Sequence, residues 1–459
     1  MSEQTTSEKK SFSPPRSPDF PPPRSPARSP DFPPPPPDSW SPVYAPTSPY
    51  RIHGLSVPQI SVTKMNHSYI NTKYSFYGIE QQVDNHTFLP VLLTGSDLDV
   101  SLGNALRRVF SSEIPCYGLS QDNMKITHNS SQYHREVLLE RFQFITLNNE
   151  VKALDRLQFY LADPKDVTKP LENTSIQIMK IYLHDHVVIK SIDDDKVIPV
   201  REICPYNSLL MTLNPGEKIH VLLGIPVLGT GRQHPMWQTS LTMMKYATKS
   251  DIGENLTLPE ITNHRPATLD NNVDQMSYLG YEKKNPEAII LTVESMGKYR
   301  SNTVVKRGFE VLMERLLNLR QQILNHVERG RSESVAIEED QTIRNMIRLR
   351  IINEDHTIGH LLESYILRAL RQIARAESVE TDKPELEILT NSLSAYRKIH
   401  PLENHVDLLV KFPLEAFDIA EYGDVEHPAI RLILIVITHL VQMLQNHSMQ
   451  LGENFGLSK

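Results

Sequence analysis

Two segments far apart in the chain share one pattern of apolar and polar positions. The first reads SLGNAL over 101–106 and the second TIGHLL over 357–362. In each, apolar residues recur at i, i+3, i+4, i+7 and i+8, which is one stripe of an amphipathic helix. The repeat therefore predicts two related halves in one polypeptide. The stripes consist of Leu102, Ala105, Leu106, Val109 and Phe110 in the first copy and Ile358, Leu361, Leu362, Tyr365 and Ile366 in the second.

The first turn of each repeated helix carries two further signals. Ser101 and Thr357 open the two copies, and a hydroxyl at that place is typical of a helix N-cap. Gly103 and Gly359 follow two residues later. Because glycine inside a helix costs roughly 1 kcal/mol relative to alanine, we expect a neighbouring element to pack closely against each first turn.

The remaining pattern predicts an α+β protein. Long apolar stripes predict four helices over 101–112, 301–326, 357–375 and 428–449, and their stripes are expected to form a shared core. Alternating or β-branched runs predict strands over 88–93, 289–293 and 346–352. Short apolar runs around the acidic turn Asp193-Asp194-Asp195 predict an inserted β-rich subdomain over 151–221. A polar stretch after Gly330 predicts a linker over 330–342.

The most apolar late segment, 429–444, contains Arg431, His439 and Gln442. Those polar residues and the short length argue against a membrane span. We expect this segment to be buried between layers of the protein.

The first 55 residues differ in composition from the rest of the chain. The eight-residue unit RSPDFPPP occurs at 16–23 and again at 28–35. Proline removes backbone donors, so this segment is predicted to be a disordered tail. A solvated tether is one interpretation. Phosphorylation at the six Ser-Pro sites, or binding to an SH3-type or WW-type groove, is another.

Composition narrows the function classes. The chain has 459 residues and a formal net charge of −7, so a broad cationic surface for nucleic acid is not expected. Its two cysteines, Cys116 and Cys204, exclude a disulfide framework and a four-cysteine zinc site, and fit a reducing compartment. An apolar secretory signal is not visible at the N-terminus.

Six short motifs occur in a fixed order over the ordered part of the chain. GNALRRVFSSEIP at 103–115 resembles the signature of the RNA polymerase α subunit N-terminal domain and of its eukaryotic relative, the third subunit of RNA polymerase II. NEDHTIGHLL at 353–362 and HPLE at 400–403 are similar to the eleventh subunit. The other three, REVLLERFQFITL at 135–147, GTGRQHPMW at 229–237 and VESMG at 293–297, resemble the third-subunit family. Six ordered motifs are far more specific than one.

The resemblance implies a fusion of the two subunits, as in large nucleocytoplasmic DNA viruses. Two α-like dimerisation halves would form an intramolecular pseudo-dimer, with 60–150 and 222–329 in the third-subunit-like half and 343–459 in the eleventh-subunit-like half. The chain would be a non-catalytic assembly subunit that holds the two large subunits of a DNA-directed RNA polymerase. It would bind DNA only through the assembled enzyme.

The resemblance also implies partners and contact residues. Expected partners are the largest and second-largest polymerase subunits and a small zinc-binding subunit. Asn104, Arg107, Arg108 and Trp237 are candidates for the large-subunit interface, with solvated cations and core packing as the alternatives. The second copy has Glu363 and Ser364 where the first has the arginine pair, which suggests that the halves face different large subunits. The apolar stripe residues other than Ala105 are the candidates for intramolecular dimerisation.

Neither a cofactor nor a bound metal is expected. Relatives often carry a cysteine cluster in the inserted subdomain, whereas this chain has only Cys204 there. His184 and His186 alternate with other residues and are predicted to share an ordinary strand face. Glu354 and Asp355 are predicted to interact with the dipole of the following helix rather than to act as catalysts.

An alternative function is a free-standing interaction protein that presents an α-like platform and perturbs host transcription. The expected location is intracellular. For a viral chain it would be the host cytoplasm and the virion, with the nucleus as a further compartment.

Overall fold

The structure is a computed structural model, and it describes residues 61–64, 88–95, 98–247, 288–339, 343, 346–381, 392–400, 402–412 and 427–454. Side chains are described for these residues except 61–64, 88, 376–381 and 447–454. The predicted tail over 1–55 lies outside the described residues.

One group of elements combines an antiparallel sheet with two helices. The sheet has the strand order β1-β2-β14-β13. Helix α1 packs on β13 and β14, and helix α7 packs on α1, β14 and β2. The elements are β1 (Ser61–Lys64), β2 (Phe88–Thr94), α1 (Val100–Ser112), β13 (Ser240–Tyr246), β14 (Ala288–Ser295) and α7 (Ser301–Arg329).

A second group repeats this composition later in the chain. Its antiparallel sheet has the order β15-β16-β18-β17, and α8 packs on β17 and β18. The elements are β15 (Val335–Glu339), β16 (Met346–Ile352), α8 (His356–Thr381), β17 (Leu393–Arg397), β18 (His405–Lys411) and α10 (Pro428–Asn454). The four long helices begin within one residue of the predicted positions.

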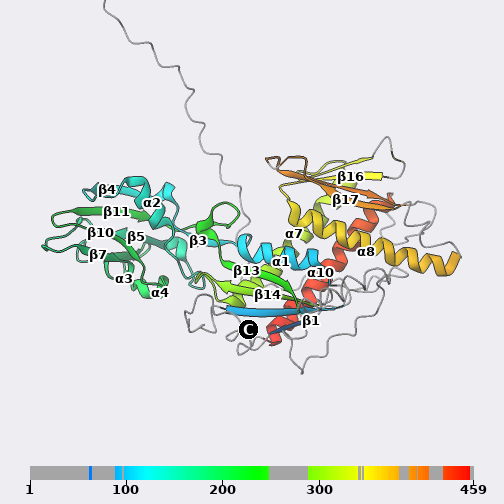
Figure 1. Cartoon of the computed structure of the whole chain (residues 1–459). Helices are drawn as coiled ribbons and strands as arrows, with labels where there is room; N and C mark the ends of the chain where they lie inside the picture. Colours follow the sequence, from blue (N-terminus) through cyan, green and yellow to red (C-terminus); the bar gives the residue numbers. More distant parts are fainter. Residues whose placement is uncertain are drawn as a thin grey trace, which may run out of the picture. The chain divides into compact units, whose positions relative to one another are not determined.

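The two groups share one hydrophobic core. Helix α1 packs against α8, and α7 packs against α10 (Figure 1). Buried side chains of both sheets and all four helices form a single cluster, which includes Leu106, Phe309, Leu361 and Ile433. Each amphipathic stripe is therefore covered by helices that are distant in sequence.

A separate core is formed by strands and short helices between the two parts of the first group. Its buried residues run from Leu119 to Leu223, so it begins well before the boundary predicted at Val151. Leu138 and Phe142 in α2 are fully buried there, which explains the earlier start. The elements in and around this core are β3 (Cys116–Gly118), β4 (Lys125–Asn129), α2 (Arg135–Gln143), β5 (Leu157–Leu161), β6 (Leu171–Glu172), β7 (Met179–Tyr182), α3 (Leu183–His186), β8 (Val187–Ser191), β9 (Val197–Ile198), α4 (Val200–Ile203), β10 (Leu209–Leu213), β11 (Lys218–Gly224) and β12 (Val227–Gly229).

The predicted linker contains regular structure. Gly330 ends α7 with φ 70°, but β15 follows and pairs with β16 in the second sheet. Val335 is buried and Glu338 is exposed, so this strand covers part of the core while its end faces solvent. The segment joining the two groups is thus only 330–334.

The N-cap prediction is wrong by two residues in both copies. Asp99 caps α1, and its side chain accepts a hydrogen bond from the backbone N–H of Ser101 (2.7 Å). Asp355 precedes α8 and accepts the equivalent bond from Thr357 (2.9 Å). A carboxylate interacts more favourably than a hydroxyl with the positive end of a helix dipole, which accounts for the choice.

The two glycines do mark close packing, as predicted. A Cβ atom built on Gly103 would lie 2.8 Å from the sulfur of Met244 on β13. One built on Gly359 would lie 2.7 Å from the ring of Tyr396 and 2.9 Å from Val406. Each sheet therefore approaches the first turn of its own helix.

By length and composition alone, helix α10 is long and apolar enough over Pro428–Asn446 to cross a membrane, although the sequence pattern predicts a segment buried between protein layers. Within that window 78% of the residues are buried inside the protein. Its apolar surface is accounted for by contacts with α7 and α8.

Candidate functional site

The nine residues predicted to mediate dimerisation all lie in the shared core. Each is at most 6% exposed, and all belong to the one buried cluster to which α1, α7, α8 and α10 contribute. They are Leu102, Leu106, Val109, Phe110, Ile358, Leu361, Leu362, Tyr365 and Ile366.

The residues predicted to contact other polypeptides have separate environments. Arg107 donates from Nε to Asn104 Oδ1 (3.0 Å) on the surface of α1. Trp237 is half-buried, donates from its indole to the carbonyl of Val227 (3.0 Å), and lies where a side chain at Gly229 would stand. These contacts fit the core-packing alternative for Trp237. The role of these residues at an interface stays a prediction.

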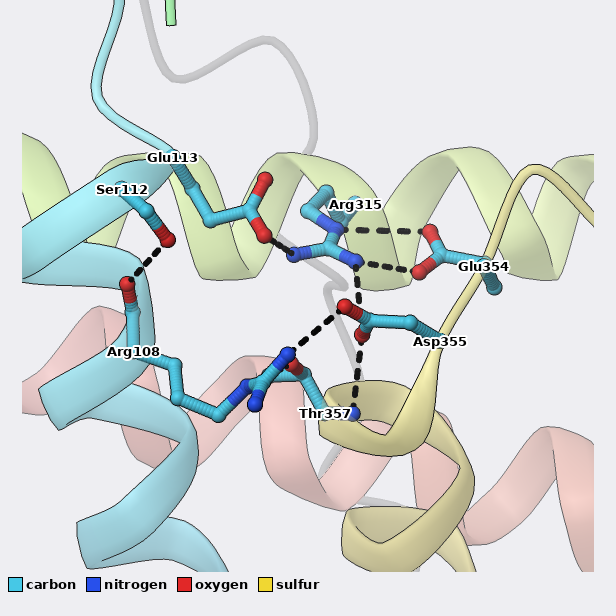
Figure 2. Close-up of polar contacts among 7 residues, drawn as sticks. All are labelled: Arg108, Ser112, Glu113, Arg315, Glu354, Asp355 and Thr357. Carbon is cyan, nitrogen blue, oxygen red and sulfur yellow. Dashed lines mark hydrogen bonds and ion pairs between the residues drawn. The ribbon is translucent and has the colours of Figure 1, made fainter. Parts of the chain in front are cut away.

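The side chain of Arg108 extends from α1 to the start of α8 in the second group. Its Nε donates to Thr357 Oγ1 (2.7 Å), and its Nη2 donates to Asp355 Oδ2 (2.8 Å), as Figure 2 shows for the second bond. Its side chain is 36% exposed. Arg108 thus bonds the residues that start α8, a contact that nothing in the sequence pattern reveals because its partners are 247 and 249 positions away.

Arg315 on α7 is the most enclosed cation of this region. It binds both carboxylate oxygens of Glu354, with Nε 3.3 Å from Oε1 and Nη2 donating to Oε2. Its Nη1 lies 3.5 Å from Glu113 at the C-terminal end of α1, and its Nη2 lies 4.0 Å from Asp355. Figure 2 shows Arg315 between these three carboxylates. Arg315, within α7, therefore contacts two helix ends, the C-terminal end of α1 and the start of α8.

We call these five residues, Arg108, Glu113, Arg315, Glu354 and Asp355, the arginine–carboxylate junction. The side chains of all but Arg108 are 16% exposed or less. Charges held this far from water are costly unless they are paired. Each of the five has an opposite charge within 4.0 Å, although Arg315 Nη1 makes no hydrogen bond among the described residues.

A second arginine makes the reverse connection at the other end of the α1–α8 contact. Arg368 on α8 donates to the carbonyl of Leu98 (3.1 Å) and lies 3.8 Å from Asp99, the cap of α1. Each helix thus sends an arginine to the capping aspartate of the other. The starts of α1 and α8 are held reciprocally.

The junction changes the acidity of its members. Burial raises the pKa of Asp355, but hydrogen bonds from Thr357 and the charges of Arg232 and Arg108 outweigh it and lower that pKa to about 2. Burial also acts against the charged form of Arg315, yet Glu354 and Glu113 raise its pKa above the usual value. Burial raises the pKa of Glu354, which Arg315 opposes. The two-point contact with Arg315 requires Glu354 to be a carboxylate.

The chemistry of this arrangement is structural. Its carboxylates are occupied by guanidinium groups and by the start of α8. Across the part of the chain that the structure describes, there is no group of three or more His, Cys, Asp and Glu side chains that could hold a metal ion. The placement of Asp355 at the start of α8 confirms the interaction with the helix terminus predicted for it.

The two histidines of the inserted region do not share a strand face, so that prediction is wrong. They lie in α3, a single helical turn. His184 Nε2 is 2.9 Å from the carbonyl of Cys204, and His186 Nδ1 is 3.2 Å from the backbone nitrogen of Tyr182. Burial raises the pKa of the Cys204 thiol to about 12, which keeps it protonated.

Comparison with known proteins gives a consistent family. Residues 94–316 match the RNA polymerase Rpb3/Rpb11 dimerisation domain. The chain is 26% identical to the DNA-directed RNA polymerase subunit Rpo3 of Pyrococcus furiosus over 262 residues, covering 52% of this chain and 94% of the relative. It is 27% identical to Rpo3 of Pyrobaculum aerophilum over 242 residues, covering 49% and 87%. A putative DNA-directed RNA polymerase subunit of Acanthamoeba polyphaga mimivirus is 20% identical over 285 residues, covering 61% and 74%.

Proposed function

Because residues 94–316 belong to the Rpb3/Rpb11 dimerisation-domain family of RNA polymerase subunits, we propose that this chain is a non-catalytic assembly subunit of a multisubunit DNA-directed RNA polymerase. It scaffolds the two large subunits for DNA-templated transcription.

The observation that carries the proposal is the pairing of two sheet-and-helix groups through one core. Helices α1 and α7 contact α8 and α10, and both sheets contribute to the same buried cluster. We interpret these groups as two α-like halves, third-subunit-like and eleventh-subunit-like, that form an intramolecular pseudo-dimer. One polypeptide then presents the platform that two separate subunits otherwise build.

Fusion has a physical advantage for such a platform. A tether replaces a bimolecular encounter by an effective concentration in roughly the millimolar range. Here the tether is the short segment 330–334 between α7 and β15. The pairing is thus independent of the concentration of a partner subunit.

The docking surface proposed for the second-largest subunit includes Asn104 and Arg107 on α1. It also includes the half-buried Trp237, the last residue of the motif at 229–237. Arg107 remains at the helix surface, where its planar group suits a protein interface. The largest subunit and a small zinc-binding subunit are the other partners proposed. The mimivirus relative supports a viral polymerase. For a viral chain, the location that we propose is the host cytoplasm and the virion.

Affinity purification of the full chain from its native source tests the proposal. We expect both large subunits to be recovered in equal amounts with the chain. An Arg107→Ala variant should recover less of the second-largest subunit, whereas Lys125→Ala, which removes an exposed cation on β4, should not. Recovery of host transcription factors without the large subunits would instead support the free-standing interaction protein.

A further inference from the structure

We propose that the arginine–carboxylate junction selects which surfaces pair: it directs an α1/α7 group to an α8/α10 group, of the same chain or of a second copy, and opposes the pairing of like with like. The inference concerns pairing within and between copies of this chain. It does not depend on the polymerase role proposed above.

Part of the contact is common to both groups and cannot discriminate. Asp99 and Asp355 are equivalent in the repeated pattern, and each receives an arginine from the opposite helix. Two α1 helices, or two α8 helices, would also bring an arginine towards a capping aspartate. Selection therefore has to come from positions at which the copies differ.

Glu354 is such a position. It precedes the cap Asp355, just as Leu98 precedes the cap Asp99. Leu98 is 2% exposed and lies in the shared core, whereas Glu354 holds Arg315 with both oxygens. The same place in the two copies is apolar in one and charged in the other.

Like-with-like pairing would remove the two-point contact between Arg315 and Glu354, leaving Arg315 the longer ion pair with Glu113 of its own group (3.5 Å). In a pair of α1/α7 groups, Arg315 would meet Leu98 of the other copy and lose its two-point carboxylate contact. In a pair of α8/α10 groups, Glu354 would meet α10, whose sequence contains one arginine, Arg431 in the first turn, and no lysine. A buried charge without its partner is strongly unfavourable, so mismatched surfaces are rejected.

A second copy of this chain can pair in the same way only if the two copies exchange halves, so that the α1/α7 group of each copy packs on the α8/α10 group of the other. The segment 330–334 between α7 and β15 is short, and short hinges favour exchange between copies when intramolecular pairing is impaired. An exchanged dimer contains two unlike junctions, each identical to the one in the monomer.

Complementary charge reversal in two full-length chains tests the inference. One chain carries Arg315→Glu and the other Glu354→Arg, so that each has like charges at its own junction. Expressed together with different tags, they should form a one-to-one heterodimer, because exchange restores opposite charges at both junctions. Expressed alone, each should give less than a tenth of the folded monomer obtained from the unsubstituted chain. The control, a single chain with both substitutions, should be a folded monomer.

Several results would overturn the inference. Folded monomers from both singly substituted chains would show that the charges do not select, as would a homodimer of either chain. Absence of the heterodimer, when the control chain folds, would do the same. The control chain could fail to fold because a glutamate at position 315 would face Glu113. In that case a double-mutant cycle without charge reversal decides, in which the stabilities of Arg315→Gln, Glu354→Gln and the double variant are compared. The inference then requires at least tenfold coupling in the unfolding equilibrium constant, and an additive cycle would contradict it.

Discussion

At the scale of single residues, the adjacent Arg107 and Arg108 make different contacts, which their positions in the sequence do not reveal. Arg107 bonds to Asn104 one turn earlier in its own helix. Arg108 bonds to Asp355 and Thr357 at the start of α8. A substitution of both arginines would therefore mix a surface effect with a loss of contact between the helix pairs.

Separate alanine substitutions distinguish the two roles. We expect Arg108→Ala to lower the free energy of unfolding by about 1–2 kcal/mol, because it removes two charge-assisted hydrogen bonds. We expect Arg107→Ala to stay within about 0.5 kcal/mol, as for an ordinary surface change. Urea unfolding of the isolated chain measures both, and equal effects would refute the distinction.

Asp355 predicts a dependence of stability on pH. Its pKa in the folded protein, about 2, lies below the ordinary value of 3.8, so its contribution is present above about pH 4 and is lost as the pH falls towards 2. Burial raises the pKa of Glu354, so its effect on stability has the opposite dependence on pH. The contribution of Glu354 is lost as the pH rises above 4.5, the ordinary pKa of a glutamate. The two windows are thus separate.

The Asp355→Asn variant isolates this contribution. Asparagine keeps an oxygen that can accept from Thr357 but has no charge, so the loss of stability between pH 4 and 2 should be smaller than in the unsubstituted chain. Unfolding midpoints across that range give the comparison. Identical profiles for the two proteins would contradict the assignment.

At the scale of elements, the sequence predicts the long helices, whose apolar residues recur periodically, but not the short strand β15 or the residues that cap the helices. The helix stripes located α1, α7, α8 and α10 because a 3.6-residue period persists over many turns. The sequence pattern predicts a linker where β15 lies, because this strand is short and ends in two glutamates. The pattern also places each helix cap two residues too late, because an aspartate two residues earlier competes better than Ser101 or Thr357.

The two glycines allow a prediction about element packing. Gly359→Ala would bring a Cβ against Tyr396 and Val406, a clash that we expect to cost about 1–3 kcal/mol. This exceeds the roughly 1 kcal/mol that alanine gains within a helix. Gly103→Ala should cost less, because its nearest neighbour is the flexible end of Met244. Denaturant titration of both variants checks the order, and a larger loss at Gly103 would reverse it.

At the scale of the whole molecule, the sequence predicted two related halves but not the contacts between them. Arg315 and Glu354 lie 39 residues apart, and Arg108 and Asp355 lie 247 apart, with nothing in local spacing to connect them. The folded chain brings them together because α1 packs on α8 and α7 on α10. Polar pairing across a core is a property of the tertiary structure and not of a local pattern.

Deletion of residues 1–50 should leave thermal stability unchanged. The sequence of this segment is rich in proline and has no apolar stripe from which to build a core. Thermal melting of the shortened and full chains provides the test. A clear fall in the melting temperature would show that the segment contributes to the fold.

The central claim, that one chain supplies both halves of a polymerase platform, is tested most directly by the native mass of the complex purified through this chain. The account predicts one copy of the chain with one copy of each large subunit, since a single polypeptide contains both helix pairs. Two copies of the chain for each large subunit, or a chain without the large subunits, would contradict it.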